Sequence, residues 1–264
     1  GHGGHGGGGA GGSGGVIAGT GGGSIPNPTT PSCEAVGGTA AVQKPTLLYQ
    51  LADRYHEGWL ASPAVIDLDG DGKNEVVVAR EERILCFGSD GALKWMFEVK
   101  GRVWASPVVA NFRGDAALEI VVASRGQIYM IDAGGQALSG FPVTWEDEIR
   151  SLAAGDVDGD GQLDIVAAPA HSGPTDVMNA WHADGSAVAG FPPNAKGISG
   201  CEADEKCYIA GCYDQNAAVG DLDGDGKQDI VVPHDNAYIS IHKGTGQAFD
   251  ANPEFKPAKT PGVR

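Results

Sequence analysis

The sequence predicts an all-β protein, a β-propeller that follows a glycine-rich N-terminal segment. Three observations predict this fold. An apolar strand, an acidic loop and a second apolar strand recur four times along the chain. A short hairpin follows each copy, and helical periodicity is missing throughout. Each unit of about 45 residues therefore holds about four short strands, which is typical of one propeller blade.

The first element, residues 1–45, is predicted to be a flexible tether. Its first 24 residues contain 15 glycines, which lose much backbone entropy on folding and offer almost nothing apolar to bury. A linker rich in Pro and Thr follows. The chain does not begin with Met and shows no signal peptide, so we expect that an export signal has been removed or that the chain is a fragment.

The blades are expected over residues 46–264. Their strand–loop–strand anchors and their hairpins alternate, and Asp-Gly, Gly-Gly or Thr-Gly pairs supply the positive-φ residues that tight turns need. The anchors are 62–79, 106–123, 151–168 and 216–233, and the hairpins are 84–98, 128–143, 178–193 and 239–255.

Two further segments affect the expected number and spacing of the blades. An insertion at about 194–213 lengthens the third unit. Residues 47–53 match the start of 93–107, so they are predicted to be the outer strand of a preceding blade. Because four blades are few, we expect this chain to hold part of a ring of about six to eight blades.

Three of the four loops between anchor strands have the pattern of a calcium site. Carboxylates stand at loop positions 1, 3, 5 and 9, a glycine at position 6 permits a sharp turn, and position 7 offers a backbone carbonyl. Ca²⁺ prefers about six to eight such hard oxygen ligands, and so many carboxylates close together repel one another without a cation. The predicted ligands are Asp67, Asp69, Asp71, Lys73 and Glu75 in the first loop, Asp156, Asp158, Asp160, Gln162 and Asp164 in the third, and Asp221, Asp223, Asp225, Lys227 and Asp229 in the fourth.

The alternative for any one loop is a solvated Asp/Gly turn that binds nothing. Three copies at equivalent positions favour calcium, with about three ions in all. A helix–loop–helix calcium motif is excluded because apolar strand residues occupy positions 10–12, where that motif needs a Glu.

The second loop is degenerate. Asn111 replaces the first Asp and Arg113 the second, while Asp115 and Glu119 remain. We expect this loop to hold no calcium and its arginine to bridge the two remaining acids as an internal cation.

Repeats of the form strand–DxDGDGxxD–strand with interleaved hairpins resemble the FG-GAP and VCBS repeat family, whose fold is similar to the propeller of integrin α chains. The resemblance covers about residues 46–256. It implies an extracellular propeller stiffened by calcium and used for adhesion or carbohydrate contact, sometimes attached to an enzyme. It does not imply a particular ligand.

The insertion carries three of the five cysteines, Cys201, Cys207 and Cys212. A disulfide within this group is favoured and would fit an exported protein. A zinc site is the alternative, although no CxxC pair supports it. Cys86 lies in an apolar strand and is expected to be buried and inert.

One row of residues just before the innermost strands is a candidate ligand face. Aromatic rings beside acids near the central channel can stack on sugar rings. The alternative is that the two tryptophans pack between blades. The row consists of Trp59, Trp104, Glu148, Tyr213 and Asp214.

Composition narrows the function. The formal net charge is −16, and the three intact acidic loops hold 12 of the 34 acidic residues. Such a surface disfavours nucleic acid and anionic lipid, and no apolar run approaches the ~18 residues of a membrane span. No nucleophile or phosphate-loop motif is present.

The sequence therefore predicts a non-catalytic, secreted or cell-surface binding module for a glycan or a protein, with surface anchoring through regions outside this sequence. The alternatives are the propeller portion of a polysaccharide lyase, or of another secreted carbohydrate-active enzyme, and a structural protein of a surface assembly.

Overall fold

A computed structural model describes residues 44–53, 58, 61–145, 148–170, 177–193, 215–233 and 239–249. Within these residues all regular structure is β-strand, as the sequence predicts, and none of it is helical. No helix there could span a membrane. The tether (residues 1–43 of it) and the insertion at about 194–213 lie outside the described residues.

The strands form four antiparallel sheets, one for each repeat, and each sheet follows the order of the chain. The first two sheets have four strands. They contain β1 (Ala64–Ile66), β2 (Glu75–Arg80), β3 (Arg83–Phe87) and β4 (Leu93–Glu98), and then β5 (Val108–Ala110), β6 (Glu119–Ser124), β7 (Gln127–Ile131) and β8 (Val143–Thr144).

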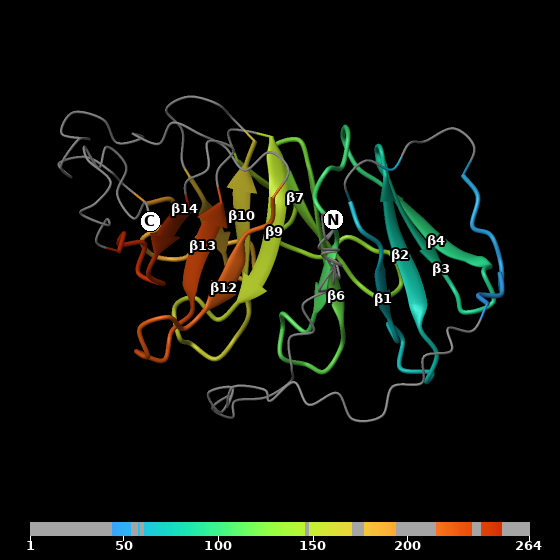
Figure 1. Cartoon of the computed structure of the whole chain (residues 1–264), viewed down its shortest axis with the longest axis horizontal. Helices are drawn as coiled ribbons and strands as arrows, with labels where there is room; N and C mark the ends of the chain where they lie inside the picture. The colour runs from blue at the N-terminus through green and yellow to red at the C-terminus, as the bar shows by residue number, and fades with distance from the viewer. Residues whose placement is uncertain are drawn as a thin grey trace, which may run out of the picture.

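The last two sheets have three described strands each. They contain β9 (Ile149–Gly155), β10 (Asp164–Pro169) and β11 (Asn179–Trp181), and then β12 (Ala218–Gly220), β13 (Asp229–Pro233) and β14 (Ile239–His242). The four sheets stand side by side in chain order, with the first and the last at opposite ends of the array (Figure 1). They form blades of an open propeller, because the array does not close into a ring.

Apolar side chains fill the space between neighbouring blades. Strand residues alternate between the two faces of a sheet, so Ile120 and Val122 of β6 pack against the first blade while Val121 and Ala123 pack toward the third. All six residues of β6 are buried for this reason. The blades thus share their cores, which explains why the strands read as nearly continuous apolar runs.

The hairpins bring neighbouring blades close together. Gly140 has a φ of +92°, and a Cβ there would lie 2.0 Å from the carbonyl oxygen of Asp184 in the next blade. Only glycine tolerates both the backbone conformation and this approach.

Two sequence predictions about single segments have different outcomes. Cys86 is fully buried and unpaired, as predicted, and burial raises the pKa of its thiol to about 11. Residues 44–53 form no strand, contrary to the prediction for 47–53. Leu47 and Leu48 are 80 % and 86 % exposed, and the ring of Tyr49 lies against Gly91 of the first blade. No described strand pairs with this segment.

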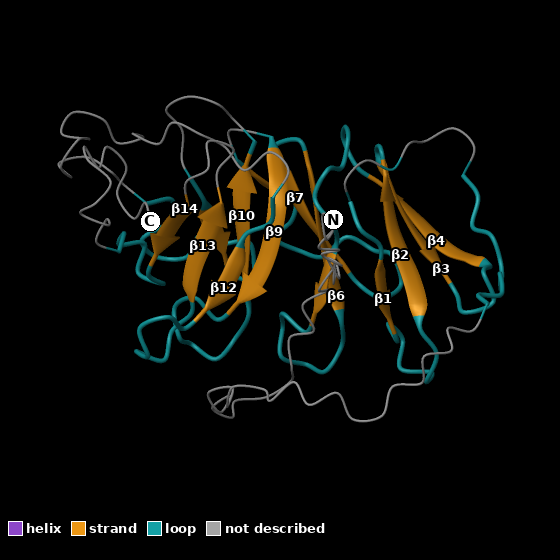
Figure 2. Cartoon of the chain, viewed as in Figure 1, coloured by secondary structure: helices purple, strands orange, loops and turns teal. Residues whose placement is uncertain are grey.

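The meander places all acidic loops at one edge of the array. In each blade the first and third strands run in the same direction, so the acidic loop after the first strand and the hairpin after the third strand lie at the same edge. Figure 2 shows the connections between first and second strands at the lower edge of the sheets. Residues of the hairpins can therefore reach the acidic loops.

Candidate metal centre

Backbone amides hold each acidic loop in a common shape. The ninth carboxylate accepts a hydrogen bond from the second loop residue in all four loops, for example from Leu68 N to Glu75 (2.9 Å) and from Leu222 N to Asp229 (2.8 Å). The first aspartate accepts from the amide at position 6, as Asp67 does from Gly72 (2.9 Å). Backbone amides thus fold each loop around its carboxylates.

This shape gathers predicted ligands within reach of one ion. In each of the three intact loops, three carboxylates offer oxygens that lie within 4.8 Å of one another. The position 7 residues, Lys73, Gln162 and Lys227, donate their amides to the fifth-position aspartate and so belong to the same turn. The groups are Asp67, Asp69 and Asp71, then Asp156, Asp158 and Asp164, then Asp221, Asp223 and Asp225.

The fourth loop holds a buried carboxylate oxygen without a protein partner. Asp229 is fully buried, and its Oδ1 makes no hydrogen bond while Oδ2 accepts from Leu222. Burial, reinforced by the neighbouring acids, raises the pKa of Asp229. The Lys243 ammonium bonds Asp223 at 2.6 Å. Burying an anionic oxygen without a partner costs desolvation free energy. A cation bound at this oxygen would offset that cost.

The first loop has a tethered cation of its own. Lys94 Nζ lies 2.6 Å from Asp69 Oδ2 and 3.0 Å from Glu75 Oε1. Its hydrogen bonds with these two acids raise the pKa of Lys94. The sequence prediction missed this residue. Lys94 lies on β4, about 20 residues after the loop, so the spacing within the loop carries no signal for it.

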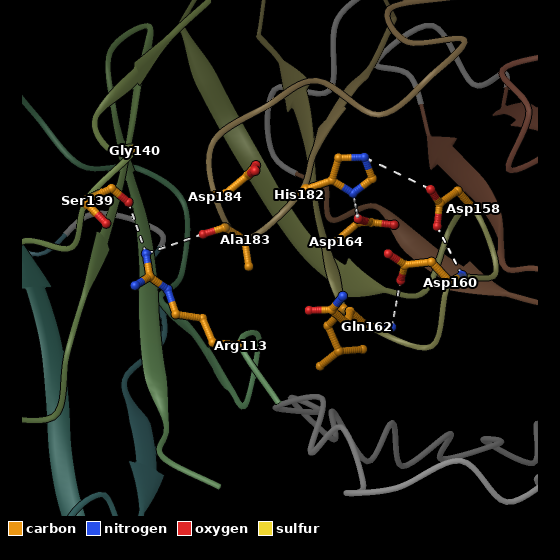
Figure 3. Close-up of a pocket in the computed structure, with 11 residues that line it drawn as sticks. Arg113, Ser139, Gly140, Asp158, Asp160, Gln162, Asp164, His182, Ala183 and Asp184 are labelled. Atoms are coloured by element: carbon orange, nitrogen blue, oxygen red, sulfur yellow. Dashed lines mark hydrogen bonds and ion pairs between the residues drawn. The ribbon is translucent and has the colours of Figure 1, made fainter. Parts of the chain in front are cut away.

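The third loop meets an imidazole. His182 Nδ1 lies 2.8 Å from Asp164 Oδ1, and its Nε2 lies 4.0 Å from Asp158 Oδ2. Burial raises the pKa of Asp164 to about 6. A cavity of about 570 Å³ opens beside these groups, with Arg113 of the second loop on its opposite wall (Figure 3). The sequence prediction did not include His182 among the ligands.

The degenerate second loop uses its arginine differently from the prediction. Arg113 Nη2 donates to the carbonyl oxygens of Ser139 (3.0 Å) and Ala183 (3.4 Å). The prediction that it bridges Asp115 and Glu119 is therefore wrong. The guanidinium instead reaches hairpin carbonyls of the second and third blades, while the backbone amides of Ala117 and Phe112 bond the two acids. The arginine is left to link the second blade to the third.

The structure brings two residues of the predicted ligand face together. The Arg150 guanidinium lies 3.8 Å above the ring of Trp104 and donates to Glu148. One face of this tryptophan is therefore already covered by a cation–π contact. Trp59, Tyr213 and Asp214 lie outside the described residues, as do Cys201, Cys207 and Cys212.

Repeated antiparallel blades with an acidic loop at one edge define this chain as a β-propeller module. Two family models then match it, an FG-GAP-like repeat at residues 111–167 and an FG-GAP repeat at residues 215–248. These two stretches are thus FG-GAP repeats, as the sequence resemblance predicts. No curated protein matches the sequence.

Among solved structures, the chain is similar to BBS1N in complex with ARL6DN, soaked with lead, with a TM-score of 0.53 and 13 % identity over 74 % of this chain and 57 % of that one. Exotype rhamnogalacturonan lyase YesX matches at a TM-score of 0.46 and 14 % identity, over 74 % of this chain and 43 % of the lyase. The V. cholerae biofilm matrix protein Bap1 matches at 0.38 and 18 %, over 76 % and 40 %. The chain thus spans 40–57 % of these structures, and the first of them supports the fold alone.

Proposed function

We propose that this chain is a calcium-stabilised propeller module of a secreted or cell-surface protein, and that it binds a glycan or a protein without catalysis. The observation that carries the calcium part is Asp229 Oδ1, a buried carboxylate oxygen without a protein partner inside a loop of four acids. Ca²⁺ suits this loop because it accepts several carboxylate and carbonyl oxygens in flexible geometry.

The calcium would act on the edge of the array where all the acidic loops lie. It would neutralise neighbouring carboxylates and tie each loop to the two strands that flank it. Such ions stiffen loops that already have their fold, so they serve stability more than chemistry. The surface that binds the glycan or protein would then lie away from the acidic loops. The cluster of Trp104, Arg150 and Glu148 is the candidate for it.

Thermal unfolding with and without calcium tests the proposal. With an affinity on the order of 10 µM and ~1 mM calcium, each occupied site adds about 2.7 kcal/mol by mass action. For a chain of this size that amounts to about 5–10 °C per site. Chelator should therefore lower the melting temperature, and readdition of calcium should restore it. An unchanged melting curve would contradict the calcium proposal.

The non-catalytic part has a separate test. Acidic and neutral polysaccharides incubated with the calcium-loaded protein should release no unsaturated oligosaccharides, which would be seen as new ultraviolet absorbance. Product formation abolished by chelator would instead favour the lyase alternative.

A further inference from the structure

The hairpin residue that faces the acidic loop differs in every blade. At equivalent positions after the third strand stand Gly88, Asp132, His182 and Lys243. Only the third of these is a nitrogen ligand for metals, and it faces an intact acidic loop. The third loop therefore differs from its sister loops through a residue about 20 positions further along the chain.

We propose that this loop forms a site for a divalent transition-metal ion of the zinc class, with Asp158, Asp160 and His182 as the protein ligands. One ligand atom from each of the three residues lies within 4.8 Å of the others. Asp158 and Asp160 lie two residues apart in the acidic loop. The imidazole of His182 extends toward them from the neighbouring hairpin (Figure 3). The proposal goes beyond calcium binding and has its own experimental test.

The orientation of the imidazole is what a metal ligand requires. His182 Nδ1 lies 2.8 Å from the Asp164 carboxylate, and when Nδ1 donates its hydrogen there, Nε2 of the neutral ring carries the lone pair. That nitrogen is the one that faces Asp158. Metal-binding histidines commonly donate their other ring N–H to a carboxylate in this way, which fixes the ring and strengthens the ligand.

A second observation concerns the oxygens around the site. Asp156 Oδ1 is buried and makes no hydrogen bond, so this loop has a carboxylate oxygen that no protein group bonds. Asp164 Oδ1, by contrast, is engaged by His182, whereas its counterpart Asp229 Oδ1 has no partner. The ninth carboxylate thus meets an imidazole in the third loop and keeps an oxygen without a hydrogen-bond partner in the fourth.

The cavity leaves the proposed ion accessible. It is about 570 Å³ in volume and is lined by the three ligands together with Gln162 and Arg113. An ion held by three protein ligands keeps positions open for water or for a donor group of a bound molecule. Replacing a hard oxygen by an imidazole shifts the preference from Ca²⁺ toward transition metals such as Zn²⁺.

Zinc titration calorimetry in about 1 mM calcium, at the upper end of the dissociation constants of extracellular calcium modules, tests the proposal on the wild-type chain and on His182→Gln. We expect the wild type to bind one more zinc ion than the variant, or to bind it at least about tenfold more tightly. The matched control is Lys243→Gln at the equivalent hairpin position, which leaves the third loop unchanged and should retain the zinc ion that His182→Gln loses. Histidines and cysteines elsewhere are present in all three proteins, so the difference isolates this loop.

Asp160→Asn provides a second variant in case His182→Gln lowers the yield of folded protein, because Asp160 is exposed on the loop. It should show the same loss of zinc binding at an unchanged fold, and Co²⁺ absorption in the visible range should report the loss of nitrogen ligation in His182→Gln. Equal zinc binding by the wild type and His182→Gln would overturn the proposal, as would a wild type that binds no zinc. The calcium-dependent melting shift is measured separately, so either proposal can fail alone.

Discussion

The third and fourth acidic loops have nearly the same sequence, DVDGDGQLD and DLDGDGKQD, and nearly the same backbone hydrogen bonds. They differ in the side chain that the neighbouring hairpin supplies. His182 engages the ninth carboxylate of the third loop, while Lys243 bonds the third-position aspartate of the fourth and leaves Asp229 Oδ1 without a partner. The comparison teaches that the loop motif fixes where the carboxylates gather, and that the hairpin decides which basic side chain meets them.

The first and second loops extend the same lesson. Lys94 supplies an ammonium to the first loop, and the second loop replaces an acid with Arg113, which turns away to the next blade. A lysine thus meets the first and fourth loops and a histidine meets the third, whereas the arginine of the second loop bonds carbonyl groups outside it.

The largest expected effect comes from Asp229→Asn. In calcium this change should remove one ion and lower the stability by about 2.7 kcal/mol, or about 5–10 °C. In chelator the effect should reverse to a small gain, because the variant no longer buries a charge without a partner. Melting curves in calcium and in chelator measure the sign of the stability change in each condition. A loss of stability of the same size in chelator would show that Asp229 acts through packing alone.

Lys243→His exchanges the hairpin partner of the fourth loop for that of the third. If the hairpin decides the preferred cation, this variant should gain zinc affinity by about tenfold. Calorimetric titration with zinc measures the gain, and Lys243→Gln is its control. An equal gain in both variants would mean that loss of the lysine charge, and not the imidazole, is responsible.

Lys94→Met removes the tethered cation of the first loop. The carboxylates of Asp69 and Glu75 then have no ammonium to compete with calcium, so the calcium affinity of this loop should rise roughly fivefold, since ligand charge sets the affinity of such sites. In chelator the variant should melt earlier than the wild type, because Glu75 is buried and loses its partner. Calcium titration and melting in chelator are the two measurements, and Lys73→Met, on the exposed side of the same loop, is the control.

Arg113→Met should have the smallest effect. The arginine donates two hydrogen bonds to carbonyl groups across the boundary between the second and third blades. Their loss should cost about 0.5–1 kcal/mol, equally with and without calcium, because no ion is proposed in this loop. A calcium-dependent change in the melting temperature would show that the arginine influences the third loop across the cavity.

Much of the fold follows from the sequence because the repeats are local. Each strand–loop–strand anchor and each Asp-Gly turn is encoded within a stretch of about 20 residues, and each forms the predicted element. Residues 47–53 resemble an outer strand equally well, yet they form none, because a strand also needs a neighbouring strand with free backbone groups.

The sequence by itself determined the repeat, the blades and the positions of the carboxylates that can surround an ion. These properties depend on residue type and spacing along a short stretch of chain. Only the tertiary structure decided that Lys94, His182 and Lys243 meet the first, third and fourth loops, and that Arg113 does not stay within the second. The reason is geometric: the first and third strands of a meander end at the same edge, so residues about 20 positions apart become neighbours whose contacts no local pattern encodes.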